Sequence, residues 1–143
     1  MSYRYTTAGS WTPVLQLGGA STGVTYTGSR AGNYYVSGRV VVAQTRFALS
    51  SKGSSTGNMT ITGLPYAAHN TTNQIFSGYF YLGASAPTVG GVSGNYYVPY
   101  TQINPNSSVI NVMVYGTGVS STNILDSNIL NNSLFKSTYQ YLT

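Results

Sequence analysis

Few side chains in this sequence have the chemistry of a catalytic acid, base or nucleophile. Asp126 is the only acidic residue, His69 is the only histidine, and cysteine is absent. Glycoside hydrolysis normally uses two carboxylates that flank the bond, and one chain cannot supply that pair. A divalent metal ion would find only Asp126, His69 and backbone oxygens as ligands, which is a poor set. We therefore expect a protein that is not an enzyme and that holds no metal or cofactor.

Two segments match the nucleophile motif G-x-S-x-G, at residues 19–23 and 53–57. That motif works on a strand–turn–helix, with an acid and then a histidine following the serine along the chain. Here His69 precedes Asp126, and no helix is predicted after either serine. The segment Lys52-Gly53-Ser54 also lacks the glycine spacing of a phosphate-binding loop. We interpret all three as chance matches in a chain rich in glycine and serine.

His69 and Asp126 have simpler structural interpretations. His69 stands beside Asn70 in a polar segment, which predicts an exposed side chain. Asp126 stands between Leu125 and Ser127, which predicts a turn or cap residue, or the partner of one cation.

The positive charges are the most unusual feature of the composition. The formal net charge is +5, from Arg4, Arg30, Arg39, Arg46, Lys52 and Lys136 against one acid. These cations are scattered and form no basic run, so nucleic-acid binding is not expected. Exposed, solvated side chains are predicted for Lys52 and Lys136. Arg46 differs because its strand neighbours are apolar; it could stack on a tyrosine, bond backbone carbonyls or meet an acid on another protein.

Tyrosine is the second unusual feature, with 14 residues. Several lie within three residues of one another, at positions 34 and 35, 79 and 81, 96, 97 and 100, and 139 and 141. Adjacent residues of a strand point to opposite faces, so each adjacent pair should have one ring in the core and one outside. Outward rings favour a subunit interface, and a sugar-stacking surface is the alternative. The predicted partner contacts are Tyr3, Arg4, Tyr5, Arg46, Tyr96, Tyr97 and Tyr100.

Only 5% of the residues are charged, against about 25% in ordinary soluble domains. Charged side chains are one means by which proteins prevent edge-to-edge strand pairing. A chain that has so few can instead pair or cover its edges permanently in an assembly. The composition thus favours an obligate oligomer. No apolar run is long enough to span a membrane, and the N-terminus lacks the apolar core of a signal peptide.

The hydrophobic pattern predicts a series of short strands and an all-β fold, an antiparallel sandwich or jelly roll. Residues 39–49 form the longest predicted strand, with both faces covered, and a hairpin would join it through a loop at 50–57 to a strand at 58–62. Further strands are predicted at 11–17, 24–26, 34–37, 74–82, 96–101, 109–115, 123–130 and 133–142. Residues 123–130 could also form a pair of helical turns, and we prefer a strand there. Prolines 13 and 99 indicate edge strands, and Gly78 indicates a bulge or a close backbone approach. Residues 11–143 would be one domain, preceded by an arm at 1–10.

Some short motifs resemble a module of tailed-phage virion proteins. They are SKGSSTG at residues 51–57, TITGLP at 60–65, GSWTP at 9–13, and YYV at 34–36 followed by GRVV at 38–41. The resemblance is to the β-rich domain at the C-terminus of many tail fibres and tailspikes, and to small stand-alone virion proteins. It implies a homotrimer on the outer surface of a phage particle, made in the cytoplasm of a host bacterium.

Two functions are compatible with that resemblance. About ten residues precede Trp11, which favours a capsid decoration or cement protein. Such a protein would bind the major capsid protein and stabilise the head shell, with residues 2–10 as a docking arm. The alternative is a receptor- or carbohydrate-binding module at the tail, whose partner would be a host-surface glycan.

Overall fold

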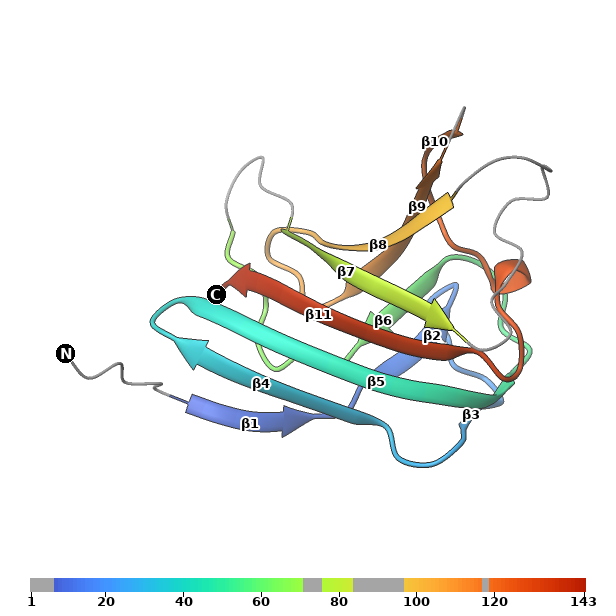
Figure 1. Ribbon diagram of the computed structural model, residues 1–143, viewed down its shortest axis with the longest axis horizontal. Coiled ribbons are helices and arrows are strands. Elements are labelled where there is room, and N and C mark those ends of the chain that lie inside the picture. The colour runs from blue at the N-terminus through green and yellow to red at the C-terminus, as the bar shows by residue number, and fades with distance from the viewer. Residues whose placement is uncertain (1–6, 71–75, 84–96, 117–118) are drawn as a thin grey trace.

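The computed structural model describes residues 7–70, 76–83, 97–116 and 119–143, and within these ranges the chain is all-β (Figure 1). Every pairing between its strands is antiparallel. The elements are β1 Thr7–Trp11, β2 Val14–Leu17, β3 Val24–Tyr26, β4 Ala31–Ser37, β5 Val40–Lys52, β6 Met59–Thr62, β7 Phe76–Gly83, β8 Tyr97–Ile103, β9 Ile110–Gly116, β10 Val119–Asn123, the 3₁₀ turn η1 Asp126–Asn128, and β11 Leu134–Leu142.

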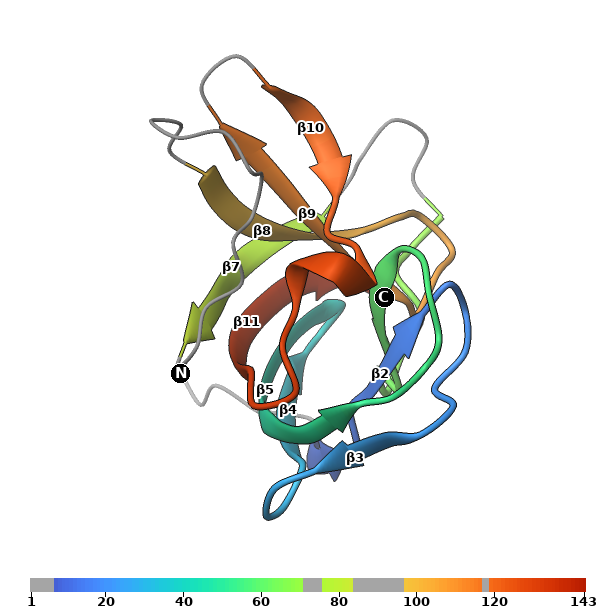
Figure 2. The same ribbon diagram turned by 90° about the vertical axis from the view of Figure 1, so that its right-hand side faces the viewer.

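The strands form two layers that face each other, which confirms the predicted sandwich. One layer has the order β1-β4-β5-β11-β7 and the other the order β8-β9-β6-β2; pairing of β7 with β8 joins them along one side. The outlying strands β3 and β10 pair with β5 and β9. Figure 2 shows the sheet curling so that β5 and β11 lie across the interior from β2 and β6.

The core fills the space between the layers and follows strict alternation along the strands. On β5, Val41, Ala43, Phe47 and Leu49 are buried; on β11 the buried residues are Phe135, Ser137, Tyr139 and Tyr141. The opposite layer contributes Ile110, Val112 and Val114 from β9, with Leu15, Leu17, Met59 and Ile61 from β2 and β6. The alternation predicted for residues 39–49, 109–115 and 133–142 is therefore confirmed on its buried side.

The predicted hairpin between residues 39–49 and 58–62 is wrong. β5 pairs with β4, β11 and β3, whereas β6 pairs with β2 and β9 in the other layer. Both edges of β5 are taken by these strands, so the connecting segment crosses between layers. β5 also continues to Lys52, which shortens the expected loop.

The second face of β5 is not covered, in contrast to the prediction. Val40 and Val42 are half-buried, while Gln44 and Arg46 are exposed. Only one face of β5 therefore packs against the core, and its other face is turned to solvent in the isolated chain.

Several boundaries also differ from the sequence prediction. Pro13 separates β1 from β2, and β1 begins at Thr7, within the segment expected to be an arm. β4 begins at Ala31, before the strand predicted from residue 34, and most of β10 lies between the strands predicted at 109–115 and 123–130. The strand preferred for residues 123–130 is instead the turn η1 between buried Ile124 and Ile129.

The predictions for Pro99 and Gly78 are confirmed only in part. Pro99 does not mark an edge strand, because β8 pairs with both β7 and β9. Its pairing with β7 nevertheless ends at Tyr100, so Pro99 lies where β8 has no β7 partner. Gly78 makes the predicted close approach, since a Cβ there would collide with the backbone oxygen of Thr138.

Candidate functional site

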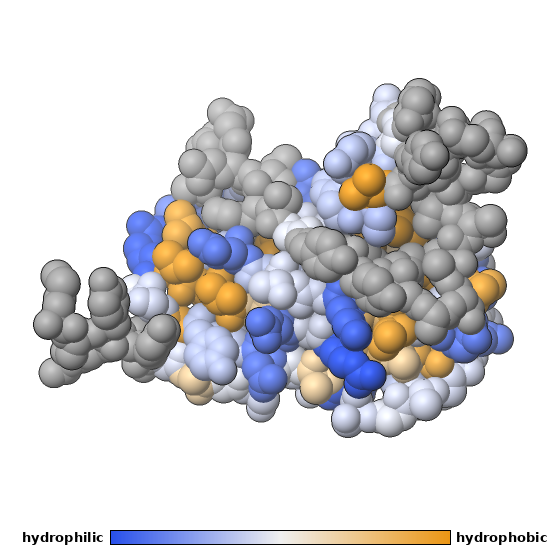
Figure 3. Space-filling model, viewed as in Figure 1, coloured by the Kyte–Doolittle hydropathy of each residue, from blue (hydrophilic) through white to orange (hydrophobic). Residues whose placement is uncertain are grey.

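The outer face of β4, β5 and β11 is an exposed surface of regular structure. We call it the outer sheet face. Figure 3 shows that hydrophilic residues cross its middle, between more apolar areas toward the two ends of β5. Alternation along the strands assigns to it Ala31, Asn33, Tyr35, Ser37, Val40, Val42, Gln44, Arg46, Ala48, Leu134, Lys136, Thr138, Gln140 and Leu142.

The strand register arranges these residues in rows across the sheet. The first row is Ala31–Arg46–Lys136, the second is Asn33–Gln44–Thr138, and the third is Tyr35–Val42–Gln140. Successive rows are two residues apart along each strand, which is about 7 Å. The face thus presents a cationic row, then a row of amides and a hydroxyl, then a row that contains an aromatic ring.

The cationic row brings two like charges together. Arg46 and Lys136 are exposed and stand directly opposite each other in the β5–β11 register. Their Cβ atoms are therefore about 5 Å apart, a spacing at which like charges destabilise a sheet. Residues of the first two rows, together with Thr45 and Ser137, line a shallow hollow of about 470 Å³.

The interactions expected of Arg46 are made by another cation. Arg30 stacks on the ring of Tyr26, with its guanidinium carbon 4.3 Å from the ring centre, and its Nη1 donates to the carbonyl of Pro13 at 3.3 Å. The third expectation for Arg46, an acid on another protein, is not tested by an isolated chain.

The single acid of the chain is part of a structural corner between η1 and the segment after β5. The Asp126 carboxylate accepts a hydrogen bond from the Gly57 amide at 2.8 Å, and the Asp126 amide donates to the Gly57 carbonyl at 3.1 Å. The Lys52 ammonium donates to the backbone oxygen of Asp126 at 2.8 Å. Asp126 is thus a turn residue, which is one of its predicted roles, although Leu125 and not Asp126 occupies the N-cap of η1. The prediction of a solvated Lys52 side chain is wrong, because Lys52 is half-buried.

The two serine motif segments meet in the same region. The Ser55 hydroxyl accepts from the Thr22 amide at 3.0 Å, which joins the two motif segments to each other. Gly53 has φ +73 and contacts the backbone of Thr22, so this glycine is required by a close crossing of the chain.

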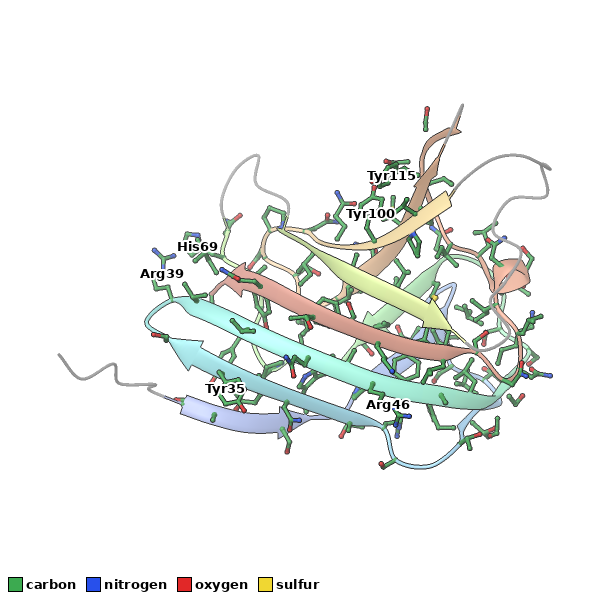
Figure 4. All side chains as sticks on the ribbon, viewed as in Figure 1. Tyr35, Arg39, Arg46, His69, Tyr100 and Tyr115 are labelled. Atoms are coloured by element: carbon green, nitrogen blue, oxygen red, sulfur yellow. The ribbon has the colours of Figure 1, made fainter. Side chains whose placement is uncertain are left out.

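His69 is half-buried rather than exposed. Its amide donates to the carbonyl of Leu142 at 2.6 Å, and its Nδ1 is buried with no hydrogen-bond partner among the described residues. Figure 4 shows His69 near Arg39 at one end of the molecule, while η1, which contains Asp126, lies at the other (Figure 1). The histidine and the acid therefore cannot act on one substrate atom.

The tyrosines divide between core and surface as alternation predicts. Tyr34 packs edge-on against Tyr66, with ring centres 5.8 Å apart, whereas Tyr35 is 50% exposed on the outer sheet face. Tyr139 and Tyr141 are buried, and burial raises their pKa values, that of Tyr141 to about 12.

A second exposed apolar cluster lies on β8 and β9. Tyr100 packs edge-on against Tyr115 with ring centres 5.6 Å apart, and Tyr115 and Val98 are about half exposed, at 49% and 46% (Figure 4). Of the predicted partner contacts, Arg46 and Tyr100 are thus exposed or half-buried but lie on different surfaces. Tyr3, Arg4, Tyr5 and Tyr96 lie outside the described residues, as does the side chain of Tyr97.

Sequence reasoning missed Lys136, Tyr35 and Tyr115 as individual site residues. Alternation could have placed Tyr35 and Lys136 on outward faces. The missing information was the register that puts Lys136 beside Arg46, since β5 and β11 are far apart in the chain.

Comparisons with known proteins agree with this fold. No protein-family model matches the chain. No curated protein matches it either. A solved structure, that of the Dettilon tailspike protein (gp208), matches over 94% of this chain with a TM-score of 0.70 and 23% sequence identity. The match covers 23% of the tailspike, so this chain spans about a quarter of the tailspike's length. The chain therefore has the fold of one part of a phage tailspike.

The described residues contain no cluster of three or more histidine, cysteine or acidic side chains that could hold a metal ion. They also contain no helix with the length and apolar character needed to cross a membrane.

Proposed function

We propose that this chain is a structural module of a phage tail fibre or tailspike, and that it presents a binding surface on the outside of the virion. One observation carries the proposal: nearly the whole chain, 94% of it, superimposes on a part of one tailspike. A module that is a quarter of a larger tail protein has the size of one domain in a multidomain chain. The motif resemblance to tail-fibre and tailspike domains supports the same placement.

The proposed role is binding and not catalysis. The carboxylate of Asp126 is bonded to the Gly57 amide, and His69 lies at the other end of the molecule. A general acid or base must reach the proton that it transfers, at about 3 Å or through one water. These two groups do not meet that condition together, which supports a non-enzymatic module.

The homotrimer implied by the resemblance also belongs to the proposal. Val98, Tyr100 and Tyr115 supply an exposed apolar and aromatic cluster on β8 and β9. Tyrosine is enriched at protein interfaces because its ring is apolar and its hydroxyl can remain hydrated. We assign the subunit contact to this cluster, which leaves the outer sheet face open to other partners.

Labelling of the purified phage particle with an antibody raised against this chain tests the location. Gold particles confined to the tail are expected. Label spread over the head would contradict the proposal and would favour the capsid decoration function predicted from the sequence. Binding of a major capsid protein stays a prediction, because none of the contacts of the described residues bears on it.

A further inference from the structure

We infer that the outer sheet face binds an anionic saccharide, whose negative group lies between Arg46 and Lys136. This inference rests on the proposed function and adds the chemical class of the ligand. The neighbouring row of Asn33, Gln44 and Thr138 would bond the hydroxyl groups of the sugar.

The charge arrangement is the first argument. Arg46 and Lys136 are opposite each other on an exposed face, where their mutual repulsion destabilises the sheet. The carboxylate of Asp126 is bonded to Gly57 in the corner by η1 and does not serve this face. An external carboxylate or phosphate placed between the two cations would remove the repulsion and form charge-assisted hydrogen bonds.

The surface beside the cations is the second argument. The hollow of about 470 Å³ extends from the cationic row to the row of Asn33, Gln44 and Thr138. Amides and hydroxyls both donate and accept hydrogen bonds, as sugar hydroxyls do. These groups lie on extended strands within the sheet, so they are held in fixed order by the β4–β5–β11 register.

The position of Tyr35 is the third argument. Tyr35 is 50% exposed and belongs to the row after the amide row, opposite Val42 of β5. Val42 is four residues from Arg46, so this row lies about 13 Å from the cationic row. An aromatic ring at the far end of a polar strip offers an apolar surface to the face of a sugar ring. The cations, the amide row and the aromatic ring lie in one line, which suits an extended oligosaccharide.

A nucleic acid is the competing polyanion. Strong binding of a nucleic acid needs several phosphate contacts along a basic stripe. The outer sheet face has two adjacent cations in one row, and its other rows are uncharged. A single anionic group on an otherwise neutral sugar matches this arrangement better.

Isothermal titration calorimetry of the full chain tests the inference with four probes. They are trigalacturonic acid, its neutral methyl ester, inorganic phosphate and oligothymidylate. Binding of trigalacturonic acid and none of its methyl ester is expected. Binding of phosphate without trigalacturonic acid would also support the site and would identify the anion as a phosphate. Absence of binding to both anions, equal binding of the methyl ester, or tighter binding of oligothymidylate would overturn it.

Matched variants locate the site. Arg46→Gln and Lys136→Gln should each weaken anion binding by about tenfold or more. Lys136→Arg should retain it, because the charge is kept. Arg39→Gln removes the same charge from an exposed position at the other end of β5 and should leave affinity unchanged. Equal weakening by Arg39→Gln would overturn the site in favour of a general charge effect. The binding data do not depend on where the antibody labels the particle, so this inference and the tail location can fail separately.

Discussion

Charge is used differently in the corner around Asp126 and on the outer sheet face. In the corner, Lys52 and Asp126 are half-buried and bonded to groups of the same chain, including the Gly57 backbone. On the outer sheet face, Arg46 and Lys136 are exposed and stand beside each other. Removing a charge should therefore destabilise the fold at the corner. On the outer sheet face it should relieve like-charge repulsion and weaken anion binding.

The largest effect on stability is expected for Asp126→Ala. The Gly57 amide would lose a charged acceptor, and hydrogen bonds to charged groups contribute about 2 kcal/mol. The free energy of unfolding, measured by urea denaturation, should fall by that amount. Asp126→Asn keeps a side-chain oxygen acceptor and should lose less. An Asp126→Ala protein as stable as wild type would show that the corner does not depend on this carboxylate.

Lys52→Met should produce the next largest effect. The substitution keeps the apolar stem and removes the ammonium that donates to the Asp126 carbonyl. We expect a loss of about 1 kcal/mol in the same denaturation experiment. Because Lys52 and Asp126 belong to one network, the double variant should lose less than the sum of the two single losses. Additive losses would indicate two independent contacts.

Arg46→Gln should change stability in the opposite direction. Relief of the repulsion with Lys136 should raise the free energy of unfolding by up to about 0.5 kcal/mol at low salt. Added NaCl screens exposed charges, so the gain should shrink as the salt concentration rises. A loss of stability at low salt would contradict our description of this pair.

The smallest effect at neutral pH is expected for Tyr139→Phe. The Tyr139 hydroxyl is buried with no hydrogen-bond partner among the described residues. Ser137 lies near enough to lower the pKa slightly, but burial dominates and raises it. Removing the hydroxyl should change stability by less than about 0.5 kcal/mol at pH 7. A large loss at pH 7 would reveal a bond that this geometry lacks.

The same buried tyrosines predict a dependence on alkaline pH. Burial raises the pKa of Tyr139 and raises that of Tyr141 from 10.0 to about 12. The unfolded chain loses these protons first as pH rises, so stability is complete below pH 10 and falls between pH 10 and about 12. Denaturation midpoints measured across this range should decrease less in Tyr139→Phe and Tyr141→Phe than in wild type. If the midpoints of wild type and of both variants decreased equally with pH, the two buried tyrosines would not be the cause of the alkaline loss of stability.

Local pattern predicted the buried faces of this protein well. Residues that alternate along β9 and β11 are buried as expected, because a core face needs only information within one strand. The hairpin between β5 and β6 failed because the choice of partner depends on strands far away in the chain. The cationic row could not be predicted for the same reason, because Arg46 and Lys136 become neighbours only through the β5–β11 register.

Electron cryomicroscopy of the purified phage particle tests the central claim most directly. We predict density of this sandwich on the tail, with the face that carries Arg46 and Lys136 open to solvent. Density over the head shell, or that face buried against another protein, would contradict the account.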